Sequence, residues 1–223
     1  MQHTLAFDVY GTLINTHGLT RQIASLVGDE QAAAFSQTWR DKQLEYSFRR
    51  GLMQLYAPFS VCTAEALDYT CQRFACQLST AQREALLYGY RQLPAFDDAH
   101  TALSALKAKQ VRCFAFSNGS RDAVVELLTH AQLIDLFDDV VSVEPLCSFK
   151  PNPAVYSHFL RATHSQHHRT SLISSNPFDV IGAKAAGMGA IWIKRDPQAV
   201  FDPWGILPDH ELGSLHELPG LLG

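Results

Sequence analysis

The sequence lacks a C-x-x-C pair, a long apolar run and a basic cluster. Its five cysteines are odd in number, so we expect small buried thiols in a reducing cytoplasm and no disulfide framework. No apolar stretch approaches the roughly 18 residues that span a membrane. The first residues carry no charged leader, which predicts no signal peptide. No basic run is longer than Arg49-Arg50, which argues against nucleic acid as the main partner.

Apolar residues are abundant instead. Hydrophobic residues make up 47% of the 223 residues and charged residues 18%, with a net charge of −4. This composition is typical of a packed globular protein of one or two domains and excludes a disordered chain.

Strands and helices alternate in the second part of the chain. Each strand is a short apolar run, and each helix repeats apolar residues every three or four positions. This alternation predicts a parallel sheet covered by helices on both faces. A further strand, which begins at Leu5 and runs up to Asp8, belongs to the same sheet. The other expected strands cover 111–116, 140–143, 171–174 and 190–193, and the expected helices lie near 98–109, 124–131, 153–163 and 178–187.

Residues 20–92 contain helical patterns and no convincing strand. Leu44, Phe48, Leu52 and Leu55 recur at helical spacing, and Ser79 with Gln82 fits a capping box. We therefore predict an α/β, Rossmann-like core formed by residues 1–15 and 94–223. A helical cap domain, residues 16–93, is inserted after the first strand.

Polar residues follow four of the expected strands. Taken alone, each is as easily a turn former, a helix cap or a solvated lysine. In parallel sheets, however, ligands bind beyond the carboxyl ends of the strands, so one crevice could hold all of these side chains. They are Asp8, Tyr10 and Thr12; Ser117 and Asn118; Lys150 and Tyr156; and Ser174, Asn176 and Asp179.

These motifs together resemble the four ordered motifs of the haloacid dehalogenase superfamily. Within it the chain is similar to the (S)-2-haloacid dehalogenases, also called L-2-haloacid dehalogenases, because its expected cap contains a closely matching segment around Arg40. The resemblance covers nearly the whole chain. It rests on Phe7-Asp8-Val9-Tyr10-Gly11-Thr12-Leu13, Trp39-Arg40-Asp41-Lys42-Gln43-Leu44-Glu45-Tyr46, Ser117-Asn118-Gly119, Lys150-Pro151 and Ser174-Ser175-Asn176-Pro177-Phe178-Asp179.

The resemblance implies a hydrolase that converts short (S)-2-haloacids to (R)-2-hydroxyacids and halide. Asp8 would attack C2 and form a covalent ester, which water then hydrolyses. Arg40 and Asn118 would stabilise the departing halide. The substrate carboxylate would bind the Ser117 hydroxyl and the backbone N–H groups of Val9 and Tyr10. Lys150 would hold Asp8 and Asp179 ionised, while Thr12, Tyr156, Ser174 and Asn176 orient the reacting groups and Phe59 and Phe178 form apolar walls.

A magnesium site is not expected. Phosphatases of this superfamily carry a second aspartate where this chain has Tyr10, and a further Mg²⁺ ligand where it has the uncharged Ser175. Mg²⁺ prefers anionic oxygen ligands, and only Asp8 and Asp179 remain. We therefore expect no metal and no cofactor. A Mg²⁺-dependent phosphatase and a non-catalytic binding protein remain as alternatives.

Asp41 departs from the close relatives, which usually carry Gln after the arginine. If Asp41 points away from the site, nothing changes. If it points inward, it opposes an anionic leaving group and suits a cationic one, as in ring-opening of a small cyclic amino acid. The resemblance alone further implies a homodimer formed through the cap.

Overall fold

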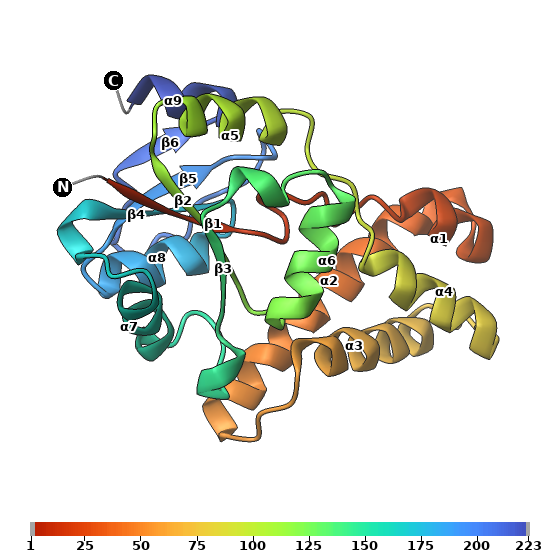
Figure 1. Ribbon diagram of the computed structural model, residues 1–223. Helices are drawn as coiled ribbons and strands as arrows, with labels where there is room; N and C mark the ends of the chain where they lie inside the picture. Colours follow the sequence, from red (N-terminus) through yellow and green to blue (C-terminus); the bar gives the residue numbers. More distant parts are fainter. Residues whose placement is uncertain (1–2, 222–223) are drawn as a thin grey trace.

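A six-stranded parallel sheet forms the centre of the computed structural model, which describes residues 3–221 (Figure 1). The strand order is β3-β2-β1-β4-β5-β6, so β1 lies inside the sheet with a neighbour on either side. The strands are β1 (Thr4–Asp8), β2 (Arg112–Ser117), β3 (Asp139–Ser142), β4 (Thr170–Ser174), β5 (Gly189–Ile193) and β6 (His210–Leu212).

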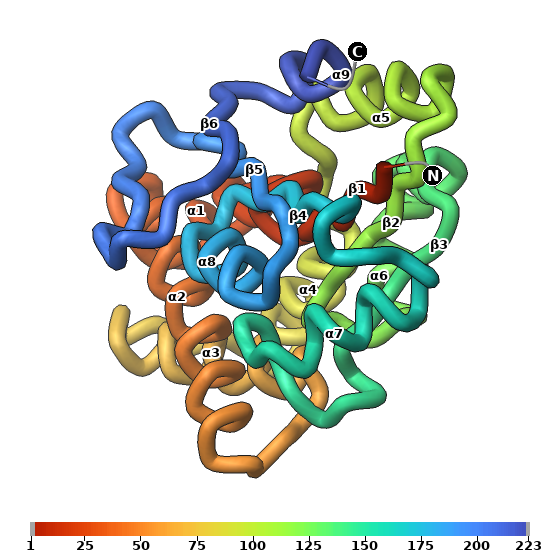
Figure 2. Tube along the Cα trace, turned by 90° about the vertical axis from the view of Figure 1, so that its left-hand side faces the viewer, coloured from red at the N-terminus to blue at the C-terminus, as the bar shows by residue number. Residues whose placement is uncertain are grey.

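Helices of the core cover both faces of this sheet. On one face lie α5 (Ala99–Ala108), α6 (Arg121–His130) and the short α9 (Leu218–Leu221). On the other face α7 (Pro153–Ala162) and α8 (Pro177–Ala185) lie beside each other (Figure 2). Short 3-10 turns occupy Ile134–Leu136, Glu144–Leu146, His167–Arg169 and Leu215–Glu217.

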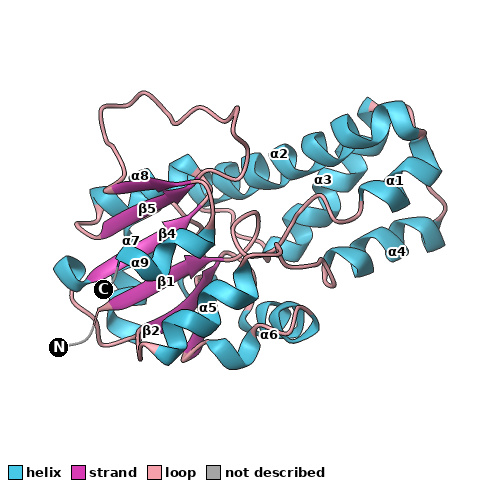
Figure 3. Ribbon diagram, turned by 90° about the horizontal axis from the view of Figure 1, so that it is seen from above, coloured by secondary structure: helices cyan, strands magenta, loops and turns pink. Residues whose placement is uncertain are grey.

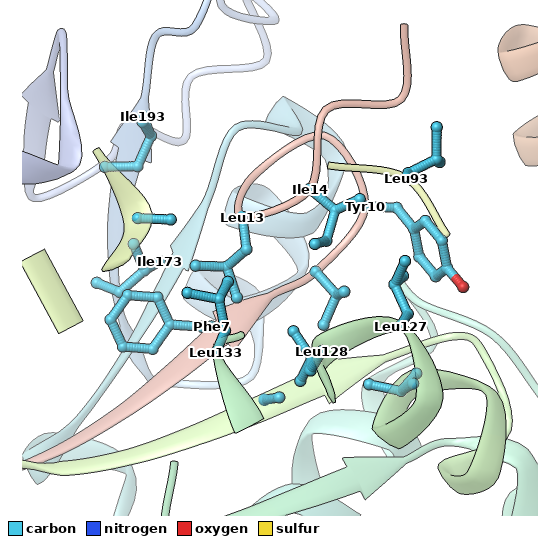
Figure 4. Close-up of a cluster of buried hydrophobic side chains, with 14 of the residues drawn as sticks. Phe7, Tyr10, Leu13, Ile14, Leu93, Leu127, Leu128, Leu133, Ile173 and Ile193 are labelled. Carbon is cyan, nitrogen blue, oxygen red and sulfur yellow. The ribbon is translucent and has the colours of Figure 1, made fainter. Parts of the chain in front are cut away.

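The sheet separates two apolar clusters, because successive side chains of a strand point to opposite faces. Phe7 and Leu5 of β1 pack on the α6 side, whereas Ala6 packs on the α7 side. Figure 4 shows Phe7 and Ile173 of the sheet together with Leu127, Leu128 and Leu133 from α6 and the residues after it. β1 is buried along its whole length, so the position of Asp8 at its end is fixed.

Four helices come between β1 and α5 in the chain and extend beyond the strand ends (Figure 3). They are α1 (Thr20–Val27), α2 (Asp29–Met53), α3 (Phe59–Arg73) and α4 (Thr80–Tyr90), and we call them the cap. The two connections between core and cap are hydrogen-bonded to each other, because Asn15 N–H donates to the Pro94 carbonyl (2.8 Å) and Phe96 N–H donates to the Leu13 carbonyl (2.9 Å). The boundaries 15/16 and 93/94 are our proposed division of the chain.

The predicted fold class is confirmed, and several local expectations are met. The five expected strands are present, and α4 begins with the expected capping box at Ser79 and Gln82. The short strand β6 was missed, since three residues are too few to show an alternating pattern.

Two local interpretations were wrong. Leu52 and Leu55 do not continue the buried face of α2: that helix ends at Met53, and the two side chains are 86% and 60% exposed. Nor are all the cysteines buried. All five are free, but Cys147 is exposed in a left-handed turn, whereas Cys62 and Cys113 are buried.

Candidate active site

Asp8 ends β1 with both carboxylate oxygens engaged. Oδ2 accepts hydrogen bonds from the Thr12 hydroxyl (2.8 Å) and from the Asn176 side-chain amide (2.8 Å). Oδ1 accepts one from Lys150 Nζ (3.1 Å). The residue is only 8% exposed, so these three donors replace the water that would otherwise solvate the carboxylate. The structure therefore brings together residues from the ends of β1 and β4 and from the segment before α7.

Lys150 is buried among acceptors, with 1% of its surface exposed. Its ammonium donates to Asp8, to Asp179 Oδ2 (2.8 Å) and to the Phe116 carbonyl (2.9 Å), and it lies 4.2 Å from the centre of the Phe116 ring. Burial alone would lower the pKa of Lys150, but Asp179 and Asp8 outweigh it and raise that pKa above its usual value. The ammonium thus lies between two carboxylates.

Asp179 is fully buried in the first turn of α8. Its Oδ1 accepts the Tyr156 hydroxyl (2.7 Å), and its Oδ2 accepts Lys150. Burial raises the pKa of Asp179, although the Lys150 charge opposes this shift. Burial and the Asp179 charge also raise the pKa of Tyr156. The expectation that Lys150 simply holds Asp179 ionised considered charge and neglected desolvation.

Gly182 makes the contact between Tyr156 and Asp179 possible and was not predicted. It lies in α8, one turn after Asp179, where a Cβ atom would overlap the Tyr156 hydroxyl and come within 2.8 Å of the Pro151 Cβ. No sequence signal distinguishes it, because a glycine inside a helix shows its packing reason only in three dimensions.

Gly182→Ala should therefore displace Tyr156 from Asp179. We expect a loss of stability of about 1–3 kcal/mol from overpacking, together with a lower rate of catalysis that Tyr156→Phe reproduces without the steric clash. Thermal unfolding and steady-state kinetics measure the two effects. Gly51→Ala in α2 is the matched control, since its Cβ would make an ordinary 3.8 Å contact with Phe149; equal losses in both variants would contradict the assignment.

The loop after β1 is tied to the segment after β4. Thr12 Oγ1, which donates to Asp8, also accepts the Ser175 N–H (2.8 Å), and the Ser175 hydroxyl donates to the Gly11 carbonyl (2.7 Å). The buried Ser174 accepts the Asn176 N–H (3.2 Å) and so orients the amide that reaches Asp8. Gly11 has φ +86°, a conformation that favours glycine.

Arg40 of α2 reaches this loop from the cap. Its Nη2 donates to the Tyr10 carbonyl (3.1 Å), and its Nη1 donates to Gln43 Oε1 (2.6 Å). Gln43 was missed, although it lies three residues after Arg40 on the same side of the helix. It is fully buried and also bonds the Tyr90 hydroxyl (3.0 Å) and Thr63 (2.6 Å), so it fixes one branch of the guanidinium.

Two predicted substrate-binding residues follow β2. Ser117 is buried, and its hydroxyl oxygen accepts the Gly119 N–H (3.1 Å). Asn118 accepts the Lys150 N–H through its side-chain oxygen (2.9 Å), which leaves its NH₂ group as the donor that can face a ligand. Val9 is buried directly after Asp8, on the strand end that carries the nucleophile candidate.

Aromatic rings of the core and of the cap contact one another. The ring of Tyr10 packs against Phe59 (5.8 Å between centroids) and Tyr90 (5.9 Å). Phe178 contacts Phe48 of α2 (4.9 Å), so it lies at the junction of cap and core. A cavity of about 530 Å³ opens beside these rings and is lined by Tyr10, Phe59, Tyr90 and Gly119 among others, but not by Asp8 or Arg40. Tyr10, two residues after Asp8, is thus the part of the β1 loop that this cavity reaches.

The side chain of Asp41 points away from the site, which was one of the two orientations considered from the sequence. It is exposed and accepts a hydrogen bond from Gln37 (2.7 Å), one turn earlier in α2. It does not oppose an anionic leaving group, and the inward orientation that would suit a cationic one is not found.

Within residues 3–221, no three or more His, Cys, Asp and Glu side chains are grouped so that they could hold a metal ion. No helix in this part of the chain is both long and apolar enough to cross a membrane.

A parallel α/β core with an aspartate at the end of its first strand and a helical cap inserted behind it defines a class of hydrolases. A family model of haloacid dehalogenase-like hydrolases matches residues 3–187. The chain belongs to this family, and within it to the group of the (S)-2-haloacid dehalogenases.

Individual relatives agree with this placement. An (S)-2-haloacid dehalogenase of Pseudomonas sp. (strain YL) is 34% identical over 211 residues, covering 95% of this chain and 90% of the relative. Haloacetate dehalogenase H-2 of Moraxella sp. (strain B) is 34% identical over 205 residues, covering 92% and 91%. The solved L-2-haloacid dehalogenase of Xanthobacter autotrophicus superimposes with a TM-score of 0.90 at 29% identity, covering 100% and 98%, and one of its structures contains covalently bound chloropropionic acid.

Proposed function

We propose that this protein hydrolyses short (S)-2-haloacids to (R)-2-hydroxyacids and halide through an ester on Asp8, without a metal ion. The observation that carries the proposal is the asymmetric set of donors around the buried Asp8 carboxylate. Two donors hold Oδ2, whereas within residues 3–221 Oδ1 accepts a hydrogen bond from Lys150 alone. Relatives named for 2-haloacids and haloacetate support the substrate class.

In the first step Oδ1 of Asp8 attacks C2 of the substrate, because it has fewer hydrogen bonds and hence more available lone-pair density. The Oδ1–C2 bond forms as the carbon–halogen bond breaks, and the electron pair leaves with the halide. One in-line displacement inverts C2, so an (S)-2-haloacid gives an (R) product.

In the second step water attacks the carbonyl carbon of the ester. Negative charge then develops on Oδ2, where the Thr12 hydroxyl and the Asn176 amide are already in place at 2.8 Å. Preorganised donors of this kind stabilise an oxyanion without further rearrangement. The hydroxyacid leaves with the former Oδ1 and takes up one proton of the water. The water oxygen remains in Asp8, whose carboxylate is restored as the second proton is released.

The charges of the substrate and of the leaving group have separate partners in this mechanism. The carboxylate binds the Ser117 hydroxyl and the backbone N–H groups of Val9 and Tyr10. The halide departs toward Arg40 and the NH₂ group of Asn118. Phe59 and Phe178 exclude bulk water, which strengthens both interactions.

Metal independence is supported by the oxygens near Asp8. The Tyr10 carbonyl accepts a hydrogen bond from Arg40 and the Gly11 carbonyl accepts one from Ser175. These oxygens are engaged by protein donors, and Ser175 offers no charge to a cation.

Halide release from a substrate panel tests the proposal. We expect chloride from (S)-2-chloropropionate and none from the (R) enantiomer, and the same rates with and without EDTA. Fluoroacetate in the same panel shows whether fluoride is also released. Hydrolysis of phosphate esters that EDTA abolishes would instead identify a phosphatase. Opening of azetidine-2-carboxylate in place of halide release would identify the ring-opening alternative.

A homodimer formed through the cap and a reducing compartment are further parts of this proposal. The first follows from the family resemblance, and the second from the odd number of cysteines.

A further inference from the structure

Arg195 lies two residues beyond the end of β5 and reaches back to the loop that carries the catalytic groups. Its Nε and Nη2 both donate to the Thr12 carbonyl, at 3.2 and 2.6 Å. Its remaining branch, Nη1, donates to Asp98 Oδ2 (2.6 Å), and its guanidinium lies 4.1 Å from the centre of the Phe96 ring. The guanidinium is therefore held by Thr12 along one edge, by Asp98 along another edge and by the Phe96 ring on one face.

Asp98 is itself fixed from the far side. The same Oδ2 accepts the Ser214 hydroxyl (2.7 Å) and the Leu215 N–H (2.8 Å), and the residue is buried at the start of α5. Burial opposes ionisation, but Arg195 and Ser214 lower the pKa of Asp98 overall. Asp98 thus anchors Arg195 to the rigid α5 side of the core.

The carbonyl and the hydroxyl of Thr12 have different partners. The carbonyl accepts Arg195, while the hydroxyl donates to Asp8 Oδ2 and accepts the Ser175 N–H. Thr12 is fully buried, so a shift of its backbone cannot be absorbed by a freely rotating side chain. Moving the carbonyl would therefore move the hydroxyl off the carboxylate.

Resting on the function proposed above, we propose that Arg195 is a positioning residue for the nucleophile: by clamping the Thr12 carbonyl to Asp98, it holds the Thr12 hydroxyl on Asp8 Oδ2. Arg195 does not touch the substrate in this scheme. It keeps Oδ1 facing C2 in the first step and one oxyanion donor in place in the second.

The arginine also bridges the two connections to the cap. Thr12 precedes the outgoing connection, and Phe96 and Asp98 follow the returning one, next to the Phe96–Leu13 hydrogen bond. If Arg195 only joined the two connections, its loss would lower the stability of the fold and would not change the hydrogen bonds of Asp8 in particular. A positioning role depends on the Thr12 hydroxyl, and this dependence can be measured.

A double-mutant cycle separates the two roles. Arg195→Lys retains the charge but loses the fork that bonds Thr12 and Asp98 together, and Thr12→Val removes the hydroxyl with little change in shape. We expect Arg195→Lys to lower kcat for (S)-2-chloropropionate by about 10-fold, because small misplacements of reacting groups are costly, with KM nearly unchanged. In the Thr12→Val background the same change should alter kcat by less than about twofold.

Arg112→Lys is the matched control. Arg112 also donates to a backbone carbonyl, that of Thr163 (2.6 Å), but from the amino end of β2, at the opposite edge of the sheet. It should leave kcat unchanged in both backgrounds. If Arg195→Lys lowers kcat by the same factor with and without the Thr12 hydroxyl, or does not lower it at all, the proposal is overturned.

A crystal structure of Arg195→Lys gives a second readout that does not depend on turnover. The proposal expects the Thr12 hydroxyl to leave Asp8 Oδ2, and an unchanged 2.8 Å contact would contradict it. If the unmodified protein releases no halide from the substrate panel, the proposed function fails, and this crystal structure still decides the role of Arg195.

Discussion

Asp8→Asn should abolish turnover of (S)-2-chloropropionate, with chloride release falling by on the order of 10⁴-fold or more. An amide is a poor nucleophile and cannot form the carboxylate ester. The replacement also places an NH₂ group or a neutral oxygen beside Lys150, Thr12 and Asn176, all of which are arranged to donate to an anion. Steady-state chloride release measures the loss.

Asp41→Asn is the matched control for this variant. Asp41 lies in the cap beside Arg40, but its side chain is exposed. Within residues 3–221 that side chain accepts one hydrogen bond, from Gln37. We expect nearly full activity. Turnover in ¹⁸O-water followed by mass spectrometry should place the label in Asp8 of the unmodified protein. Label found only in the product after one turnover by excess enzyme would mean direct attack by water.

Most of the residues around Asp8 could be predicted because they share one geometric cause. The carboxyl ends of parallel strands meet at one edge of a sheet, so Asp8, Ser117 and Asn176 come together wherever β1, β2 and β4 are neighbours. The order of these strands was not needed for that prediction. Lys150 was also placed beyond a strand end, but its role required the family resemblance, because a lysine before a proline is a common surface feature. Arg40 required the resemblance altogether, because an arginine on a helix is equally common.

The residues that escaped prediction act through contacts between distant segments. Gln43 meets Tyr90 across 47 positions, and Arg195 meets Thr12 across 183. Neither pairing leaves a periodic or local pattern in the chain. Gly182 was missed for a related reason, since its role is to leave room for Tyr156. The raised pKa of Asp179 depends on complete burial, which a charge count along the sequence does not contain.

Arg40→Ala should slow formation of the ester on Asp8 by about 10³-fold. Opposite charges about 4 Å apart at an effective dielectric constant of 20 interact with roughly 4 kcal/mol, which is about three decades of rate if the interaction arises in the transition state. The loss should be larger for fluoride and chloride than for bromide, because poorer leaving groups need more stabilisation. Rapid-quench mass spectrometry of the intact protein should detect little ester.

Asp179→Asn should have the opposite signature. Asp179 holds Lys150 Nζ in place (2.8 Å), and this ammonium lies 3.1 Å from Asp8 Oδ1, the oxygen that leaves with the product in the second step. We therefore expect the ester on Asp8 to form and accumulate while its hydrolysis is slow. If Arg40→Ala accumulates ester and Asp179→Asn does not, the two roles are assigned the wrong way round. Halide release unchanged by both substitutions would mean that the cluster around Asp8 is not the active site, because both side chains touch groups that contact this carboxylate or its loop.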